Sequence, residues 1–134
     1  MSIIIDNVEY YGIIYKVTNK ITNEVYIGQS TQKYGFRSRY RFKGNGVERM
    51  LKYYEHFRDR NYHYNEHLYR AIKKYGCDAF EVDEVHDTAM SQNELNEKEI
   101  YYVNKYDSFY HGYNNTYGGD SFPKGKNHKN SINV

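Results

Sequence analysis

The sequence lacks most of the features that stabilise small secreted proteins or anchor a chain in a membrane. Its single cysteine, Cys77, cannot form an internal disulfide, which is typical of proteins from a reducing cytoplasm. No apolar run approaches the roughly 18 residues needed to cross a bilayer, and the apolar residues 1–6 are too few for a signal peptide. We therefore expect a soluble, cytoplasmic protein that does not bind a membrane.

Tyrosine is the residue that the chain has in excess. There are 18 tyrosines and no tryptophan among 134 residues, a length that suits one domain with a modest core. A tyrosine has an apolar ring and a hydroxyl group that needs a hydrogen-bonding partner when it is buried. The core is therefore expected to contain hydroxyl groups.

Charge is distributed unevenly along the chain, although the net charge is only +2. Residues 29–76 contain twelve Lys and Arg against four acidic residues, whereas residues 77–120 contain ten acidic residues against two lysines. The basic segment is interleaved with tyrosine and phenylalanine, which is the composition of a surface that neutralises phosphates and touches bases or sugars. The alternative is a solvated basic surface without a partner.

Hydrophobic periodicity predicts an alternation of strands and helices. Residues 10–18 and 24–29 are predicted to form a hairpin, with the turn at residues 19–23, and residues 79–85 a third strand. In these strands Ile13, Tyr15 and Val17 are expected on one face, and Phe80, Val82 and Val85 point inward. Helices are predicted at residues 35–42, 47–58, 65–75 and 91–106, the third ending at Gly76 and the fourth beginning with a capping box.

The last of these helices contains an acidic residue in an apolar position. The apolar stripe that includes Leu95, Val103 and Tyr106 also includes Glu99, near its centre. A carboxylate on the core side is unfavourable unless it is paired, hydrogen-bonded or bound to a metal ion. Two structural alternatives remain, namely an ion pair with an arginine such as Arg39 and a position at the wet end of the stripe.

Several short motifs occur in an order and at spacings that identify a family. Gly-Ile-Ile-Tyr at residues 12–15 precedes Tyr-Ile-Gly at 26–28, and Arg39-Tyr40 follows in a basic segment. Downstream come the segment 67–76, Glu99 before a pair of tyrosines, and Gly-Tyr-Asn at 112–114 before Gly118-Gly119. Residues 12–120 thus resemble the GIY-YIG nuclease domain, as found in phage and intron-encoded homing endonucleases.

The resemblance implies a fold and a domain division. The expected fold is α+β, with a small, mostly antiparallel three-stranded sheet flanked by helices. Residues 1–120 would form the nuclease domain and residues 121–134 a basic linker or disordered tail. In homing endonucleases of this family, such a joint leads to a separate DNA-binding module.

The resemblance also implies a reaction, the hydrolysis of DNA phosphodiester bonds with a single divalent ion. Glu99 would be the only protein carboxylate on Mg²⁺ or Mn²⁺, which suits an ion that keeps several waters. Arg39 would clamp the scissile phosphate with two parallel hydrogen bonds, with Arg37 as the competing candidate. Tyr15 would act as the general base, although its ordinary pKa of about 10 makes proton loss costly at neutral pH. Tyr26 would orient the water or the phosphate.

Two further residues occupy positions that the family uses, and a wider set would contact DNA. Asn114 lies in the family's asparagine position, and His63 lies where the family often has a functional histidine. Lys43 stands where some members carry a histidine, so a second proton donor in that helix is in doubt. The residues expected to contact the DNA backbone are Arg37, Arg41, Lys43, Arg70, Lys73 and Lys74.

The sequence therefore supports two functions of different classes. The first is a metal-dependent DNA endonuclease, most simply the catalytic head of a homing-type enzyme and otherwise a repair or restriction nuclease. The second is a non-catalytic nucleic-acid-binding module that has kept the fold. We expect the protein to be a monomer in the cytoplasm. If a phage encodes it, this would be the cytoplasm of the host cell. An inward carboxylate favours the enzyme, because binding alone does not need one.

Overall fold

A three-stranded antiparallel sheet forms the centre of the computed structural model, which describes residues 2–58 and 64–119. Its strands are β3 (Gly12–Asn19), β4 (Val25–Ser30) and β5 (Phe80–Ala89), in the order β4-β3-β5. The predicted fold class, a small antiparallel sheet flanked by helices, is confirmed. His63 and residues 121–134, on which two predictions depend, lie outside the described residues.

The hairpin of β3 and β4 is closed by side-chain and backbone chemistry in its turn. Oδ1 of Asn19 accepts hydrogen bonds from the backbone N–H groups of Ile21 (2.9 Å) and Thr22 (3.3 Å). Asn23 has a positive φ of 67°, which asparagine tolerates better than most residues. The resulting register places Tyr15 opposite Gly28 and Val17 opposite Tyr26.

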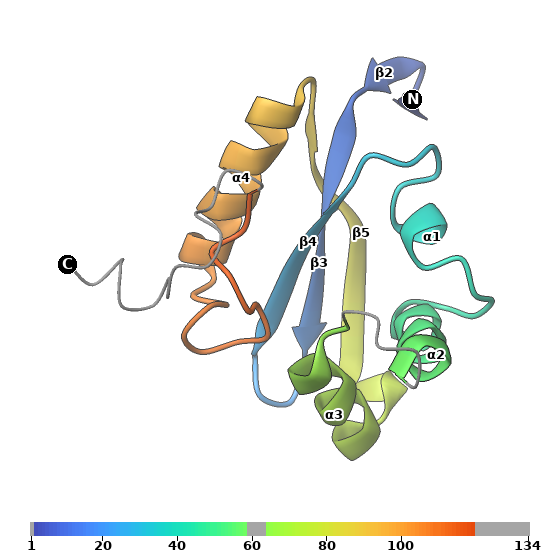
Figure 1. The fold of residues 1–134 in the computed structure, drawn as a ribbon, viewed down its shortest axis with the longest axis vertical. Coiled ribbons are helices and arrows are strands. Elements are labelled where there is room, and N and C mark those ends of the chain that lie inside the picture. The colour runs from blue at the N-terminus through green and yellow to red at the C-terminus, as the bar shows by residue number, and fades with distance from the viewer. Residues whose placement is uncertain (1, 59–63, 120–134) are drawn as a thin grey trace.

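Helices cover both faces of the sheet, as Figure 1 shows. On one face, the core contains Ile13, Tyr15 and Val17 of β3 together with residues of α1 (Phe36–Arg39), α2 (Val47–Phe57) and α3 (Glu66–Tyr75). On the other face, Ile14 packs with residues of α4 (Gln92–Lys105). The alternation predicted for β3 is therefore confirmed, and it separates two small cores.

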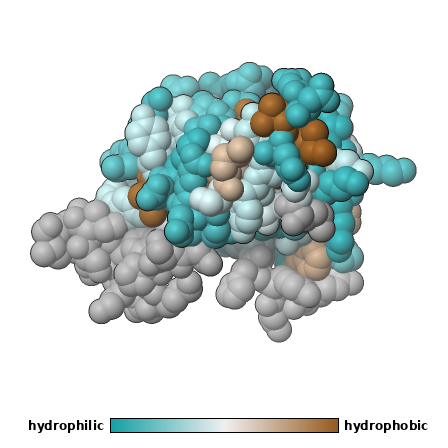
Figure 2. Space-filling model, turned by 90° about the horizontal axis from the view of Figure 1, so that it is seen from above, coloured by the Kyte–Doolittle hydropathy of each residue, from teal (hydrophilic) through white to brown (hydrophobic). Residues whose placement is uncertain are grey.

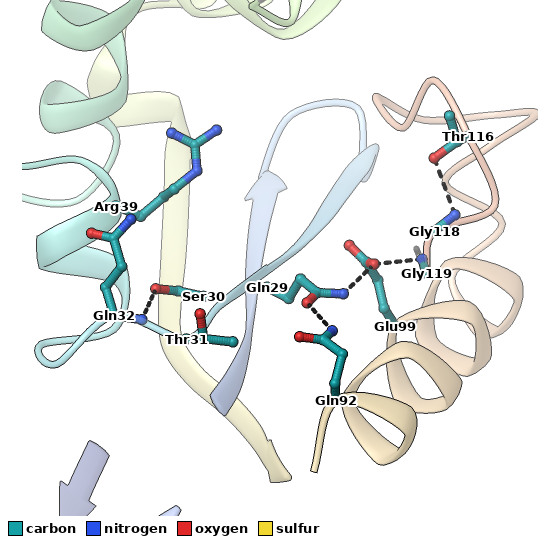
Figure 3. Close-up of a pocket in the computed structure, with 10 residues that line it drawn as sticks. All are labelled: Gln29, Ser30, Thr31, Gln32, Arg39, Gln92, Glu99, Thr116, Gly118 and Gly119. Atoms are coloured by element: carbon teal, nitrogen blue, oxygen red, sulfur yellow. Dashed lines mark hydrogen bonds between the residues drawn. The ribbon is translucent and has the colours of Figure 1, made fainter. Parts of the chain in front are cut away.

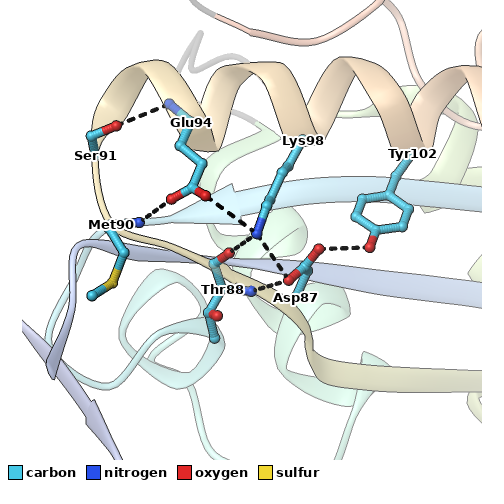
Figure 4. A network of polar contacts seen from close by, with 7 residues as sticks. All are labelled: Asp87, Thr88, Met90, Ser91, Glu94, Lys98 and Tyr102. Atoms are coloured by element: carbon cyan, nitrogen blue, oxygen red, sulfur yellow. Dashed lines mark hydrogen bonds and ion pairs between the residues drawn. The ribbon is translucent and has the colours of Figure 1, made fainter. Parts of the chain in front are cut away.

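Helix α4 is tied to the end of β5 by a polar network (Figure 4). Ser91 caps the helix, its Oγ accepting from the backbone N–H of Glu94 (3.1 Å). Lys98 donates to the backbone oxygen of Thr88 (2.6 Å) and lies 3.3 Å from Oδ1 of Asp87. Oδ2 of Asp87 accepts from the hydroxyl of Tyr102 (2.6 Å). These contacts fix the rotation of α4, and hence the direction of Glu99.

An additional hairpin precedes the sheet, and its strands were not predicted. Strands β1 (Ile3–Ile5) and β2 (Val8–Tyr10) are joined by Asp6 and Asn7, whose φ values of 51° and 66° are typical of a tight hairpin turn. The predicted first strand began at residue 10 and therefore crossed the break between β2 and β3. This hairpin lies at the upper end of the molecule in Figure 1, an end whose surface in Figure 2 is mostly hydrophilic.

Strand β5 (Phe80–Ala89) continues beyond the predicted range of 79–85, and helix α1 (Phe36–Arg39) is shorter than the predicted range of 35–42. The prediction that Val85 points inward is wrong, because Val85 is 46% exposed. The pairing of β5 shifts between the partners of Ile14 and Lys16, so an irregularity interrupts the alternation at this point. Helix α1 ends at Arg39, four residues after Gly35.

No helix in residues 2–58 and 64–119 is long and apolar enough to cross a membrane.

Candidate active site

Four of the residues predicted to be catalytic, Tyr26, Arg39, Glu99 and Asn114, lie along the edge strand β4, whereas His63 is outside the described residues. Tyr26 belongs to the face covered by α1–α3, and Gln29 reaches α4 on the opposite face. Two neighbouring pockets, of about 400 and 300 Å³, open beside this strand. Arg39, Glu99 and Thr116 line both pockets. The strand edge thus brings groups from both sides of the sheet into one hollow (Figure 3).

Arg39, at the end of α1, is the cation of this hollow. Its guanidinium carbon lies 4.7 Å from the ring centre of Tyr40 and 4.9 Å from that of Tyr53. Burial alone would lower the pKa of Arg39, but the hydroxyl groups of Tyr40, Tyr15 and Tyr26 outweigh it and raise the pKa. A half-buried, permanently charged guanidinium held against aromatic rings suits the binding of a phosphate.

Arg37, the competing candidate, lies elsewhere. Its side chain is exposed and forms an ion pair with Glu84 of β5, with an Nε–Oε1 distance of 3.1 Å. It lines neither of the two pockets. The geometry therefore favours Arg39 over Arg37 as the group that could hold a phosphate in the hollow.

Glu99 projects from α4 toward the edge of β4, as its place in the apolar stripe predicted. Its Oε1 accepts hydrogen bonds from Nε2 of Gln29 (2.7 Å) and from the backbone N–H of Gly119 (2.6 Å). A Cβ added to Gly118, which has a φ of 90°, would lie 2.8 Å from Cγ of Glu99. The glycines let the C-terminal loop pack directly on the glutamate.

The two predicted catalytic tyrosines occupy different surroundings. Tyr15 is 1% exposed, and its hydroxyl shares a 2.8 Å hydrogen bond with that of Tyr40. Tyr26 is half-buried and lines the smaller pocket, its ring centre 6.2 Å from that of Tyr15. Burial raises the pKa of both hydroxyls above its ordinary value, and the nearby Tyr40 raises it further. Tyr26 is thus the one that faces the hollow, with Tyr15 behind it.

Asn114 contacts the strand rather than the open part of the pocket. Its Oδ1 accepts from the backbone N–H of Ile27 (2.8 Å) and from Oγ of Ser108 (2.7 Å), and its Nδ2 donates to the backbone oxygen of Ile27 (2.8 Å). The amide therefore completes the hydrogen bonding of β4 on its outer side. This arrangement lets Asn114 hold in place the part of β4 that carries Tyr26, directly before Ile27, and Gln29, two residues after it.

Most of the basic residues predicted to contact DNA lie away from the hollow. Arg41, Lys43, Arg70, Lys73 and Lys74 are exposed. Arg70 forms an ion pair with Glu66, and Lys73 lies 3.4 Å from Glu55. Arg70 and Lys74 line a separate small pocket beside Tyr113, next to Glu24. Their contact with DNA stays a prediction.

Several residues of the hollow were not anticipated from the sequence. Gln29 and Gln92 lie beside Glu99, and Thr116 lines both pockets. Gln29 directly follows the Tyr-Ile-Gly motif, and this adjacency was the available signal. The others lie far along the chain from the residues that they contact, so spacing alone does not reveal them.

The residues around Glu99 suit a hard, hydrated divalent cation. Within residues 2–58 and 64–119, no group of three or more His, Cys, Asp or Glu side chains could hold a metal ion. The larger pocket beside Glu99 is lined by amide and hydroxyl groups and by Arg39, and among the described residues no histidine or cysteine lines it. One carboxylate with room for water is the arrangement that Mg²⁺ accepts, whereas zinc needs more protein ligands.

Comparison with known proteins identifies the fold. No family model and no curated protein matches the sequence. Two solved structures of the catalytic domain of the homing endonuclease I-TevI do match, one of which carries a glutamate-to-alanine substitution. Their TM-scores are 0.52 and 0.51 at 20% and 21% identity, and the matches cover 78% and 77% of this chain and 93% and 96% of those chains. This chain has the fold of the GIY-YIG endonuclease catalytic domain.

Proposed function

We propose that this chain is a metal-dependent DNA endonuclease that hydrolyses phosphodiester bonds. The observation that carries the proposal is the convergence of Arg39 and Glu99, which come from opposite faces of the sheet and line the same two pockets. Tyr26 lines one of these pockets. Phosphodiester hydrolysis requires a cation that clamps the phosphate, a carboxylate and a hydroxyl group, and the hollow contains all three.

The proposed roles follow from where each group lies. Arg39 binds two oxygens of the scissile phosphate and balances the charge that develops on them. Tyr26 orients the attacking water from the pocket wall, while Tyr15 and Tyr40 form a buried hydroxyl pair behind it. If Tyr15 is the general base, as the resemblance implies, its proton must leave a buried hydroxyl whose pKa is raised. Asn114 positions β4.

Glu99 is proposed to hold the divalent ion. When bound, Mg²⁺ or Mn²⁺ would neutralise the phosphate oxygens and the departing oxygen. The single carboxylate in an oxygen-rich pocket supports this assignment. The residues of the chain then supply the binding of the phosphate and the orientation of the water.

We further propose that the domain acts as a monomer and as the catalytic head of a homing-type enzyme. Its own sequence preference would be weak, because a separate DNA-binding module reads the sequence in enzymes of this type. Cleavage of plasmids of unrelated sequence should then give scattered cuts. Cuts confined to one short sequence would instead support a restriction-type enzyme.

Plasmid cleavage with and without Mg²⁺ tests the proposed activity. The wild-type protein should nick supercoiled DNA only when the metal is present. Glu99→Ala should abolish nicking and leave the fold intact or more stable, because a carboxylate on the core side is removed. Glu97→Ala is the matched control, since Glu97 is exposed on the same helix.

Two outcomes would contradict the proposal. Nicking that depends on Mg²⁺ and persists in a folded Glu99→Ala protein would exclude Glu99 as the metal ligand. A wild-type protein that binds DNA but cuts it with neither Mg²⁺ nor Mn²⁺ would instead be the non-catalytic nucleic-acid-binding module.

A further inference from the structure

The carboxylate of Glu99 lies at the end of a chain of side-chain amides. Nε2 of Gln29 donates to Oε1 of Glu99 (2.7 Å) and to Oδ1 of Asn96 (3.1 Å). Nε2 of Gln92 donates to Oε1 of Gln29 (3.2 Å) and to the same Oδ1 of Asn96 (2.8 Å). The hydroxyl of Tyr11 donates to Oε1 of Gln92 (2.8 Å). Strand β4 and helix α4 are thus joined by consecutive hydrogen bonds that lead to the glutamate.

The amides in this chain point in one direction. Oδ1 of Asn96 accepts from both glutamines, so each glutamine must turn its NH₂ group toward it. The oxygen of Gln29 accepts from Gln92, which leaves the nitrogen of Gln29 facing Glu99. Turning the amide of Gln29 over would bring its NH₂ group against that of Gln92, and turning that of Gln92 would bring its oxygen against the oxygens of Gln29 and Asn96. The network therefore presents a donor, and never an acceptor, to the carboxylate.

This donor and the backbone N–H of Gly119 act on the same carboxylate oxygen, Oε1. Two donors from different directions fix the rotation of the carboxylate about its last bond. In Figure 3 the other oxygen of Glu99 is turned toward the space between Arg39 and Thr116. The carboxylate is thus oriented before any ligand arrives.

We propose that Gln29 is the positioning residue that orients Glu99 for monodentate binding of the divalent ion. The inference rests on the proposed function, in which Glu99 holds that ion. Gln29 suits this role because it lies on β4, whose position is set by pairing with β3 and by Asn114. Partners that orient a metal ligand typically change metal affinity or activity by about 10- to 100-fold when they are removed.

Direct metal binding tests the proposal without relying on cleavage. Mn²⁺ is titrated into the DNA-free protein and free Mn²⁺ is measured by electron paramagnetic resonance, with Glu99→Ala as the blank. Gln29→Met keeps the length of the side chain but removes its donor, and should weaken Mn²⁺ binding by about 10-fold or more. Asn93→Ala, which removes an exposed amide from α4, should bind Mn²⁺ as the wild-type protein does.

Kinetics separate positioning from simple tethering of α4. The Gln29→Met protein should show a lower kcat and a higher half-saturating Mg²⁺ concentration, with its KM for DNA within about twofold of wild type. Gln92→Met should have a smaller effect in the same direction, because it leaves the donor of Gln29 in place. If Gln29→Met does not fold, Gln29→Asn serves instead, since its amide is one methylene too short to reach Glu99.

Each result decides between the two proposals. Wild-type binding of Mn²⁺ in a folded Gln29→Met protein, with or without a loss of stability, would overturn the positioning role while leaving the nuclease intact. A wild-type protein that neither binds Mn²⁺ through Glu99 nor cleaves DNA would overturn both.

Discussion

The glycine of the Tyr-Ile-Gly motif is predicted to be essential because a buried ring lies across it. Gly28 pairs with Tyr15 in the hairpin, and a Cβ added to Gly28 would lie 2.7 Å from Cε1 of Tyr15 and closer still to its Cζ and hydroxyl oxygen. The ring cannot move aside, since its centre is 5.1 Å from that of Phe36 and 5.8 Å from that of Tyr40. Gly28→Ala must therefore distort the core around Tyr15.

The cost of this substitution can be worked from its parts. Overpacking of a filled core typically costs about 1–3 kcal/mol, and a trapped aromatic ring belongs at the upper end. Displacing Tyr15 also breaks its hydrogen bond with Tyr40, worth about 1 kcal/mol. Replacing glycine by alanine lowers the entropy of the unfolded chain and returns about 0.4–1 kcal/mol. The net loss should be about 3 kcal/mol.

Urea unfolding of a double-mutant cycle provides the assay. Gly28→Ala is measured alone and in a Tyr15→Leu background, where the smaller side chain leaves room for the added methyl group. In that background the substitution should cost less than about 0.5 kcal/mol, so the two changes couple by 2 kcal/mol or more in magnitude. Gly76→Ala is the control, because its φ of 85° makes the substitution strained while no atom lies within 4 Å of the added Cβ.

Additive free energies would refute this reasoning. If Gly28→Ala cost the same with and without the Tyr15 ring, the glycine would serve a backbone role unrelated to the tyrosine. Gly76→Ala should cost the same in both backgrounds, about 1–3 kcal/mol for a backbone conformation that essentially only glycine adopts. An equal cost excludes a general sensitivity of the weakened protein.

Three further predictions concern the site and its supports. Tyr26→Phe and Tyr15→Phe should both fold. In single-turnover cleavage, the substitution that removes the general base should lower the cleavage rate by at least roughly 100-fold, and small and equal losses would exclude both tyrosines as the base. Asn114→Ala leaves a backbone N–H and a backbone oxygen of β4 without their partner and should cost about 2–4 kcal/mol in urea unfolding; a loss below 1 kcal/mol would contradict its structural role. Burial alone would raise the pKa of Asp87, but hydrogen bonds, first that from Tyr102, lower it. The ionised carboxylate of Asp87 therefore stabilises the fold above its unfolded pKa of about 3.9. This stabilisation disappears as pH falls through the folded pKa. The stability difference between wild type and Asp87→Asn should therefore be full at pH 7 and shrink below about pH 4.

Local pattern was sufficient for most of the elements and for one site residue. The alternation in β3 predicted which side chains share a face, and the helical stripe placed Glu99 on the inner side of α4. Both are periodicities of a regular backbone, so they can be read along the chain. The prediction from strand alternation is wrong at Val85, because an irregularity in the pairing of β5 shifts the alternation there. The β1–β2 hairpin was not predicted, because strands of three residues are too short to show a clear alternation.

The contents of the hollow depended on contacts between distant segments. Arg37 and Arg39 are equally basic and two residues apart, and only the packing of α1 decides that one pairs with Glu84 and the other lines the pockets. Gln29 and Glu99 are separated by 70 residues, and their hydrogen bond requires both the strand order and the rotation of α4.

The sequence by itself determined the order of the helices and of the strands of the central sheet, and the presence of an inward carboxylate, because backbone periodicity and turn chemistry are local. Only the tertiary structure decided that Tyr15 lies buried behind Tyr26, that Asn114 supports β4, and that an amide chain points at Glu99. These are consequences of which strand lies at the edge of the sheet and which helix packs against it. A side chain acquires such a role from its neighbours in space, and these neighbours are often far from it along the sequence.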